Sequence, residues 1–199
     1  MAEISIDEIK RLRTMTGVGM TDAKKALAET DGDFDKALEA MRVKGMAKAA
    51  KKSERVAKEG LVASYVHSDR IGVLVEVNCE TDFVARTEDF KTFVHDVAMH
   101  VAASNPTFVT TDDVDEKTLE KEKELIGKEL KESGKPDEMI DQITEGKIKK
   151  YYTEVCLLEQ PYIKNPDQTV GDYLNEIIAK LGENIVIRQF SRLELGEVQ

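Results

Sequence analysis

The stretch LVASYVHSDRIGVLVEVNCETDFVAR, residues 61–86, decides the fold, because two β-rich runs, a short turn and the start of a helix follow one another within it. The first run ends at His67, and Ser68–Arg70 forms the turn. The second run alternates between two faces, with Ile71, Val73, Val75 and Val77 on one and Gly72, Leu74, Glu76 and Asn78 on the other. This period of two predicts a β-hairpin with one buried face.

The hairpin is followed by an abrupt change from apolar to polar residues. Thr81 is suited to be the N-cap of a helix, and the helix dipole favours Asp82 in its first turn. Phe83, one of six phenylalanines in the chain, stands directly beside this acid. The pattern leaves two alternatives open for Phe83, since its ring either folds back onto the hairpin or is exposed at the corner.

Two further helices and a third strand complete a predicted α+β core. Apolar residues recur at helical spacing over residues 90–101. A second amphipathic helix begins at Thr169, and residues 185–193 alternate as a strand. We therefore expect an antiparallel sheet of at least three strands with helices on one side, formed by residues 61–111 and 153–199.

The N-terminal part, residues 1–45, predicts a compact module of three short helices. The two glycines within Thr16–Met20 indicate a turn after the first helix. Thr21 is the expected N-cap of the second helix, and Gly45 is the expected end of the third. Such a module is near the lower size limit for independent folding.

Two other segments are charged and carry little apolar surface. Residues 46–60 are basic and rich in alanine, and we interpret them as a solvated helix or linker rather than an RNA-binding stripe, because no aromatic residue is interleaved to stack on bases. Residues 112–152 contain two charged helices on either side of Ser133–Pro136, with Gly134 at the expected helix end and Pro136 at the expected helix start. Their narrow apolar stripes predict a protruding antiparallel hairpin, a helical coiled coil.

Composition excludes several classes of protein. A formal net charge of −10 argues against nucleic-acid binding, because phosphate contacts need a basic surface. No apolar stretch is long enough to span a bilayer, and the first residues lack the basic and apolar regions of a signal peptide. Cys79 and Cys156 stand far apart without a CxxC spacing. We therefore expect a cytoplasmic protein with reduced thiols that binds neither nucleic acid directly nor a membrane.

The sequence contains little that is typical of an active site. His95 and His100 are five residues apart, which does not place two metal ligands on one helical face. Cys79 has acidic neighbours, Glu80 and Asp82, which are expected to raise the pKa of its thiol and make it a poor nucleophile. Two acids at a helix start are more often caps than metal ligands. We therefore expect no catalytic residues, no metal and no cofactor, and a protein that acts by contacting another protein.

Three segments, in order along the chain, carry a family resemblance: LRTMTGVGMTDAKKAL (residues 12–27), NCETDFVAR (78–86) and LGENIVIR (181–188). Together they resemble bacterial elongation factor Ts, in the short form that has a single core, and the resemblance covers nearly the whole chain. It implies a guanine-nucleotide exchange factor for elongation factor Tu, the GTPase of translation elongation. It also implies that the N-terminal module is ubiquitin-associated-like and that the charged hairpin is the coiled coil of the family.

The resemblance further implies which residues contact elongation factor Tu. Asp82 and Phe83 would push in beside the magnesium and nucleotide site of the partner, with Phe83 entering an apolar pocket. Thr81 and Val84 would complete the region that displaces the magnesium ion. Other contacts would come from Met20, Lys24, His67, Leu181 and Gly182. Thr21 departs from the family pattern, which often has a second methionine there.

The short form of the family completes itself as a homodimer. His67 and the Asp82–Phe83 pair that serve one partner molecule would then come from different chains. Two other classes of function remain alternatives from the residues alone. A plain adaptor that tethers partners predicts that Phe83 is packed in the core, and a cytosolic enzyme that uses Cys79 predicts turnover sensitive to alkylation.

Overall fold

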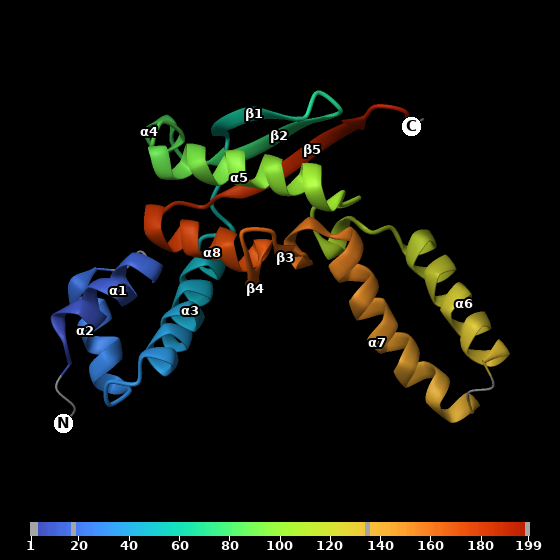
Figure 1. Cartoon of the computed structure of the whole chain (residues 1–199), viewed down its shortest axis with the longest axis horizontal. Coiled ribbons are helices and arrows are strands. Elements are labelled where there is room, and N and C mark those ends of the chain that lie inside the picture. The colour runs from blue at the N-terminus through green and yellow to red at the C-terminus, as the bar shows by residue number, and fades with distance from the viewer. Residues whose placement is uncertain (1–3, 17–18, 134–135, 198–199) are drawn as a thin grey trace.

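The computed structural model describes residues 4–16, 19–133 and 136–197, and it has the predicted α+β architecture (Figure 1). The helices are α1 (Ile6–Thr16), α2 (Met20–Glu29), α3 (Phe34–Ala50), α4 (Asp82–Ala85), α5 (Glu88–Ser104), α6 (Glu116–Glu132), α7 (Asp137–Val155) and α8 (Val170–Leu181), with two 3-10 turns, η1 (Thr111–Asp113) and η2 (Leu157–Glu159). The strands are β1 (Glu59–His67), β2 (Ile71–Cys79), β3 (Pro161–Tyr162), β4 (Asn165–Thr169) and β5 (Val186–Glu194).

The central sheet consists of three antiparallel strands in the order β1–β2–β5. β1 and β2 form the predicted hairpin, with Glu59 opposite Cys79 at one end and His67 opposite Ile71 at the other. β5 pairs with the free edge of β2. The turn of the hairpin and α4 lie at opposite ends of the sheet (Figure 1). The alternating pattern therefore predicted all three strands correctly.

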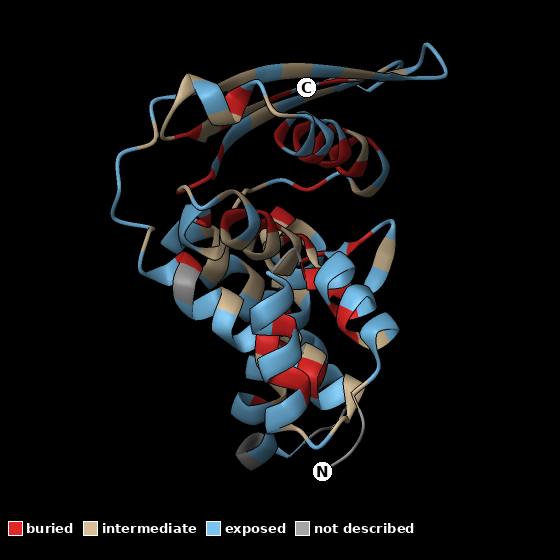
Figure 2. Cartoon of the chain, turned by 90° about the vertical axis from the view of Figure 1, so that its left-hand side faces the viewer, coloured by how far each residue is buried: buried red, intermediate tan, exposed pale blue. Residues whose placement is uncertain are grey.

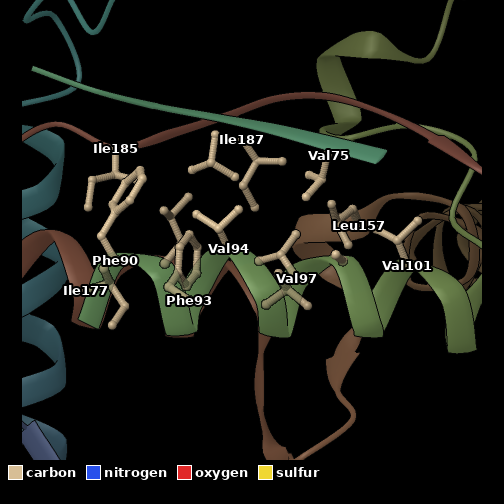
Figure 3. Packing of buried hydrophobic residues seen from close by; sticks show 14 of the residues in the cluster. Val75, Phe90, Phe93, Val94, Val97, Val101, Leu157, Ile177, Ile185 and Ile187 are labelled. Atoms are coloured by element: carbon tan, nitrogen blue, oxygen red, sulfur yellow. The ribbon is translucent and has the colours of Figure 1, made fainter. Parts of the chain in front are cut away.

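The main core lies between this sheet and the helices α5 and α8 (Figure 3). Phe90 and Phe93 of α5 are fully buried. They are joined by Val75 from β2 and Ile187 from β5. Burying one such side chain stabilises the fold by about 1.5–3 kcal/mol, so this layer accounts for much of the stability. The helical spacing over residues 90–101 had predicted the core face of α5.

The opposite face of the sheet is exposed, since α5 and α8 cover only the inner face and α4 lies at one end of the sheet (Figures 1 and 2). Apolar side chains from all three strands remain on this outer face. Val62, Val66, Leu74 and Leu193 are each more than half exposed. Gly72 lies in register between Val66 and Leu193, so those two side chains flank a position without a side chain. On the same face Ser64 and Ser191 flank Leu74, and Glu76 lies opposite Val62, so the apolar side chains form a patch that is interrupted by polar residues.

The N-terminal helices α1, α2 and α3 pack around a small core of their own, which includes Leu12 and Leu27. The predicted start of α2 was wrong, because Gly19 is the N-cap and Thr21 lies inside the first turn. In the predicted turn before it, residues 17 and 18 lie outside the described residues.

The predicted end of α3 at Gly45 was also wrong, because the helix continues to Ala50. A Cβ atom at Gly45 would lie 3.8 Å from the Cβ of Ala179 in α8, so this glycine sits at a helix–helix contact rather than at a helix end. Packing against α8 supports the additional turn of α3. One continuous helix therefore connects the N-terminal module to the core.

The helices α6 and α7 lie side by side and project from the core (Figure 1). α7 continues beyond the predicted end at residue 152 to Val155, and the predicted helix end at Gly134 lies outside the described residues. The likeness of this hairpin to a family coiled coil, and of α1–α3 to a ubiquitin-associated module, stays a prediction. The buried contact between α6 and α7 is apolar and consists of Ile126, Leu130, Ile140 and Ile148.

A buried carboxylate attaches the small hairpin β3–β4, which the sequence pattern did not predict. Asp96 of α5 accepts hydrogen bonds from the Tyr162 hydroxyl at 2.8 Å and from Lys164 Nζ at 2.6 Å. The Tyr173 hydroxyl of α8 donates to the same carboxylate at 3.4 Å, and the rings of Tyr162 and Tyr173 stack with centroids 4.7 Å apart. The Asp96 network thus joins β3–β4 to both core helices.

Candidate functional site

The corner between β2 and α5 is formed by the single-turn helix α4. Thr81 is its N-cap, as predicted, and its hydroxyl accepts a hydrogen bond from the Val84 N–H at 3.4 Å. Ala85 is buried and attaches the turn to the core. Phe83 is 79% exposed, the highest value among the large apolar side chains of the described chain. The alternative in which Phe83 folds back onto the hairpin is therefore wrong.

Asp82, the acid beside Phe83, forms an ion pair within the same turn. The Arg86 guanidinium donates to the Asp82 carboxylate at 2.8 Å. The Arg86 side chain is 77% exposed and that of Asp82 is 46% exposed, so water competes for the contact and the pair contributes at most about 1 kcal/mol. Asp82 can therefore leave Arg86 at little cost when a stronger cation is offered.

The C-terminal end of α8 lies directly against this corner. Gly182 ends α8 in the left-handed conformation, with φ 80°, which a residue without a Cβ adopts without strain. The next residue, Glu183, reaches the corner, and its carboxylate accepts hydrogen bonds from the backbone N–H groups of Glu80 and Thr81, each at 3.0 Å. The structure thus joins Thr81 to Glu183, the residue that follows Leu181–Gly182, although more than 100 residues separate the two in the sequence.

Met20 and Lys24 lie one turn apart on the exposed side of α2. Met20 is 40% exposed. In Figure 1, α2, α4 and the end of α8 occupy the same side of the molecule. All predicted contact residues except His67 therefore lie on this side.

His67 is at the far end of the β1–β2 hairpin from α4 (Figure 1). Nine-residue strands separate the two positions, which corresponds to roughly 25 Å at about 3.3 Å per residue. The Tyr65 hydroxyl lies 3.1 Å from His67 Nδ1, and the two rings stack with centroids 6.1 Å apart. The structure therefore does not bring His67 next to Phe83 within one chain.

A family model described as "Elongation factor TS" matches residues 3–197. The chain belongs to the elongation factor Ts family. It is 57% identical over 195 residues to elongation factor Ts of Thermoanaerobacter sp. (strain X514), an alignment that covers 98% of this chain and 96% of that protein. It is 55% identical over 195 residues to elongation factor Ts of Alkaliphilus oremlandii (strain OhILAs), covering 98% of this chain and 90% of the relative.

Two residues at the corner were missed by sequence reasoning, although they stand within one of the segments that resemble elongation factor Ts. Glu183 and Asn184 follow the glycine that ends α8. The one available signal for their role was that two polar side chains directly precede an apolar strand. Their partners on Glu80 and Thr81 could not be inferred, because those lie on another element.

Within the described ranges, no helix is sufficiently long and apolar to cross a membrane, and no group of three or more His, Cys, Asp or Glu side chains is placed to hold a metal ion. Cys79 is fully buried, and its Sγ lies 3.1 Å from the Thr81 carbonyl oxygen. Burial, and then the nearby Glu183 carboxylate, raise the pKa of the Cys79 thiol to about 11. The direction agrees with the sequence prediction, but the cause is burial rather than Glu80 and Asp82.

We expect neither cysteine to react with a thiol reagent in the folded protein at pH 8. Burial raises the pKa of Cys156 to about 11 as well, and the thiolate is the reactive form. Labelling with a chromogenic disulfide should be slow in buffer and should release two equivalents in denaturant, in agreement with two cysteines per chain. Rapid labelling of Cys79 in the folded state would restore the alternative of a cysteine enzyme.

Proposed function

We propose that this chain is a guanine-nucleotide exchange factor for elongation factor Tu, which acts in the cytoplasm during translation elongation and performs no covalent chemistry. Membership of the elongation factor Ts family supports this function. The observation that carries the mechanism is the exposure of Phe83 on a turn that is capped by Thr81 and anchored by Ala85. An aromatic side chain held on an anchored and exposed turn is suited to fill an apolar pocket of a partner, and aromatic residues are enriched in the buried centres of protein interfaces.

Exchange follows from binding alone. A factor that binds the nucleotide-free partner more tightly than the nucleotide-bound partner must weaken nucleotide binding by the same ratio. Burying Phe83 in an apolar pocket of elongation factor Tu would contribute about 1.5–3 kcal/mol. At about 1.4 kcal/mol per tenfold change, this corresponds to roughly one or two decades of coupling.

Asp82 would act on the magnesium ion of the partner. An anion beside a magnesium–phosphate site competes with the groups that hold the magnesium ion, or repositions them. The exposed pair with Arg86 keeps Asp82 at the surface of the turn without committing it to a strong contact. Thr81 and Val84 flank the two active side chains and keep the turn helical through their hydrogen bond.

The remaining contacts would come from the same side of the molecule. Met20 and Lys24 offer an apolar and a basic side chain on α2, and Leu181–Gly182 lie beside the corner. A second site of contact increases the affinity for the partner because both sites are presented by one folded chain. The continuous helix α3 connects them.

The test is the release of a fluorescent GDP analogue from elongation factor Tu, followed by stopped flow. The chain should accelerate release in proportion to its concentration until a plateau. Sizing chromatography of the two proteins should show a complex that added GDP dissolves. A complex that is indifferent to GDP, with no acceleration of release, would instead support a tethering role.

We also propose that the chain forms a homodimer, as the family resemblance implies, through the outer face of the sheet. Val66, Leu74 and Leu193 expose an apolar patch there. Pairing two sheets face to face is a stable arrangement for such patches. In a dimer, His67 of one chain would be available to the partner molecule that the Asp82–Phe83 corner of the other chain binds.

The dimer prediction is tested by placing a charge in the patch. Leu74→Lys should shift the sedimentation mass from two chains to one, since a buried unpaired ammonium is strongly unfavourable. The matched control is Leu125→Lys, at a leucine on α6 that is 61% exposed, which should stay dimeric. A dimer that persists in Leu74→Lys would contradict this interface.

A further inference from the structure

The corner that presents Phe83 is held by a carboxylate that is distant in the sequence but adjacent in space, Glu183. Glu183 Oε2 accepts hydrogen bonds from the N–H groups of Glu80 and Thr81, each at 3.0 Å. Glu183 Oε1 accepts a third from the Thr81 hydroxyl at 2.7 Å. Thr81 is also the N-cap of α4, so one carboxylate determines the position of the residue from which this helix starts.

A second set of hydrogen bonds runs in the opposite direction. Glu80 Oε1 accepts a hydrogen bond from the Asn184 N–H at 2.6 Å, and the Arg55 guanidinium lies 3.4 Å from the same oxygen. Hydrogen bonds in both directions therefore connect the end of β2 with the start of β5. The residues that form them are Glu80 and Thr81 after β2, and Glu183 and Asn184 before β5. We call these four residues the corner clamp.

The corner clamp also reaches the connector between α3 and β1. Asn184 is buried, with 4% of its surface exposed. Its side-chain amide donates to the carbonyl oxygens of Ser53 at 3.3 Å and of Arg55 at 2.7 Å. The segment that carries the N-terminal module into the sheet is thus fixed to the same point as the Phe83 corner.

Local structure alone does not hold α4 in place. A four-residue helix is too short to be stable by itself, because its nucleation cost is not recovered. The orientation of the Phe83 side chain favours binding only if the backbone of α4 is already rigid, because a loop that must become ordered during association reduces the affinity. Hydrogen bonds to a charged acceptor are stronger than those between neutral groups, and the Glu183 carboxylate accepts three of them from two consecutive residues.

We propose that Glu183 and Asn184 are positioning residues, which hold the Phe83 corner in its partner-binding orientation and fix it to the connector of the N-terminal module. The two regions of contact then meet the partner as one rigid unit. This inference rests on the proposed exchange function, because the orientation of Phe83 matters only if the partner covers it. Neither residue needs to contact the partner.

The test is a double-mutant cycle on the rate of GDP-analogue release from elongation factor Tu. Glu183→Ala should lower the initial slope of rate against factor concentration about 10-fold, equivalent to ~1.4 kcal/mol. In a chain that already carries Phe83→Ala, adding Glu183→Ala should lower the slope by a smaller factor than it does in the wild type, since coupled residues are not additive and only the contribution of Asp82 is left to lose. Equal losses in both backgrounds would show that Glu183 does not act through Phe83.

Two companion variants separate positioning from general stability. Glu183→Gln keeps one oxygen that accepts from both N–H groups, so most of the slope should return. Glu159→Ala removes an exposed carboxylate in η2 and should leave the slope at the wild-type value. Failure of Glu183→Gln to improve on Glu183→Ala would overturn the assigned role.

Amide hydrogen exchange of the free chain provides a readout that is independent of the partner. Glu183→Ala should accelerate exchange over residues 81–86 while α5 keeps its protection, because only the corner loses its anchor. Unchanged exchange over 81–86 would overturn the inference even if the proposed function holds. If wild type does not accelerate nucleotide release, the proposed function fails instead, and hydrogen exchange still decides whether Glu183 anchors the corner.

Discussion

Phe83→Ala is expected to slow the release of GDP from elongation factor Tu by about 10–100-fold, the equivalent of about 1.5–3 kcal/mol of lost burial in the complex. The free energy of unfolding of the isolated chain should change by no more than about 0.5 kcal/mol, because Phe83 is 79% exposed and lies outside the core. Stopped-flow release and urea unfolding measure the two quantities.

The matched control for this experiment is a phenylalanine that is buried. Phe93→Ala removes a side chain with no exposed surface and should cost about 3–5 kcal/mol of stability. If Phe83→Ala were destabilising to a similar extent, its loss of exchange would reflect unfolding. If Phe83→Ala accelerated GDP release from elongation factor Tu as much as wild type does, the mechanism in which Phe83 inserts into the partner would be wrong.

Asp96→Ala is expected to destabilise the chain by about 2–4 kcal/mol, because buried donors left without an acceptor cost about 1–3 kcal/mol each. The hydroxyls of Tyr162 and Tyr173 both lose the acceptor, and the Lys164 ammonium loses its pair. The control on the same helix is Asp89→Ala, which breaks an exposed pair with Lys180 and should cost less than about 1 kcal/mol. Equal effects of both variants would show that the Asp96 network contributes no more than a surface pair.

The same network predicts a loss of stability in alkali. Burial, and then the Asp96 carboxylate, raise the pKa of the hydroxyls of Tyr162 and Tyr173 above the ordinary range. Below the unfolded-state pKa of about 10, the folded and the unfolded chain both keep these protons, so the contribution of the two hydroxyls to the free energy of unfolding is fully present. Above it the unfolded chain releases protons that the folded chain retains, and stability falls by up to about 1.4 kcal/mol per pH unit for each tyrosine. Urea unfolding between pH 8 and 11 measures this slope, which a flat profile would contradict.

The boundaries of the elements show where sequence patterns were insufficient. Gly45 was expected to end α3, since glycine is common after helices. Its actual role is at a contact with Ala179 of α8, a residue more than a hundred positions away. The hairpin β3–β4 was missed for a similar reason, because its attachment depends on Asp96 of α5 and Tyr173 of α8 rather than on its own apolar spacing.

The sequence by itself determined the elements whose evidence is local. Alternation along residues 61–79 specified the hairpin, spacing over 90–101 specified the core face of α5, and Thr81 specified where α4 begins. These patterns are readable because the geometry of a strand or helix repeats within a few residues.

Only the tertiary structure decided whether Phe83 is exposed and what holds it there. The exposure of one residue at an element boundary depends on which distant segment covers it, and no segment of the described chain covers Phe83. The carboxylate that anchors the corner comes from Glu183, beyond the end of α8. Contacts between such distant residues are set by how β2, α8 and β5 pack together, and no local period in the sequence reports them.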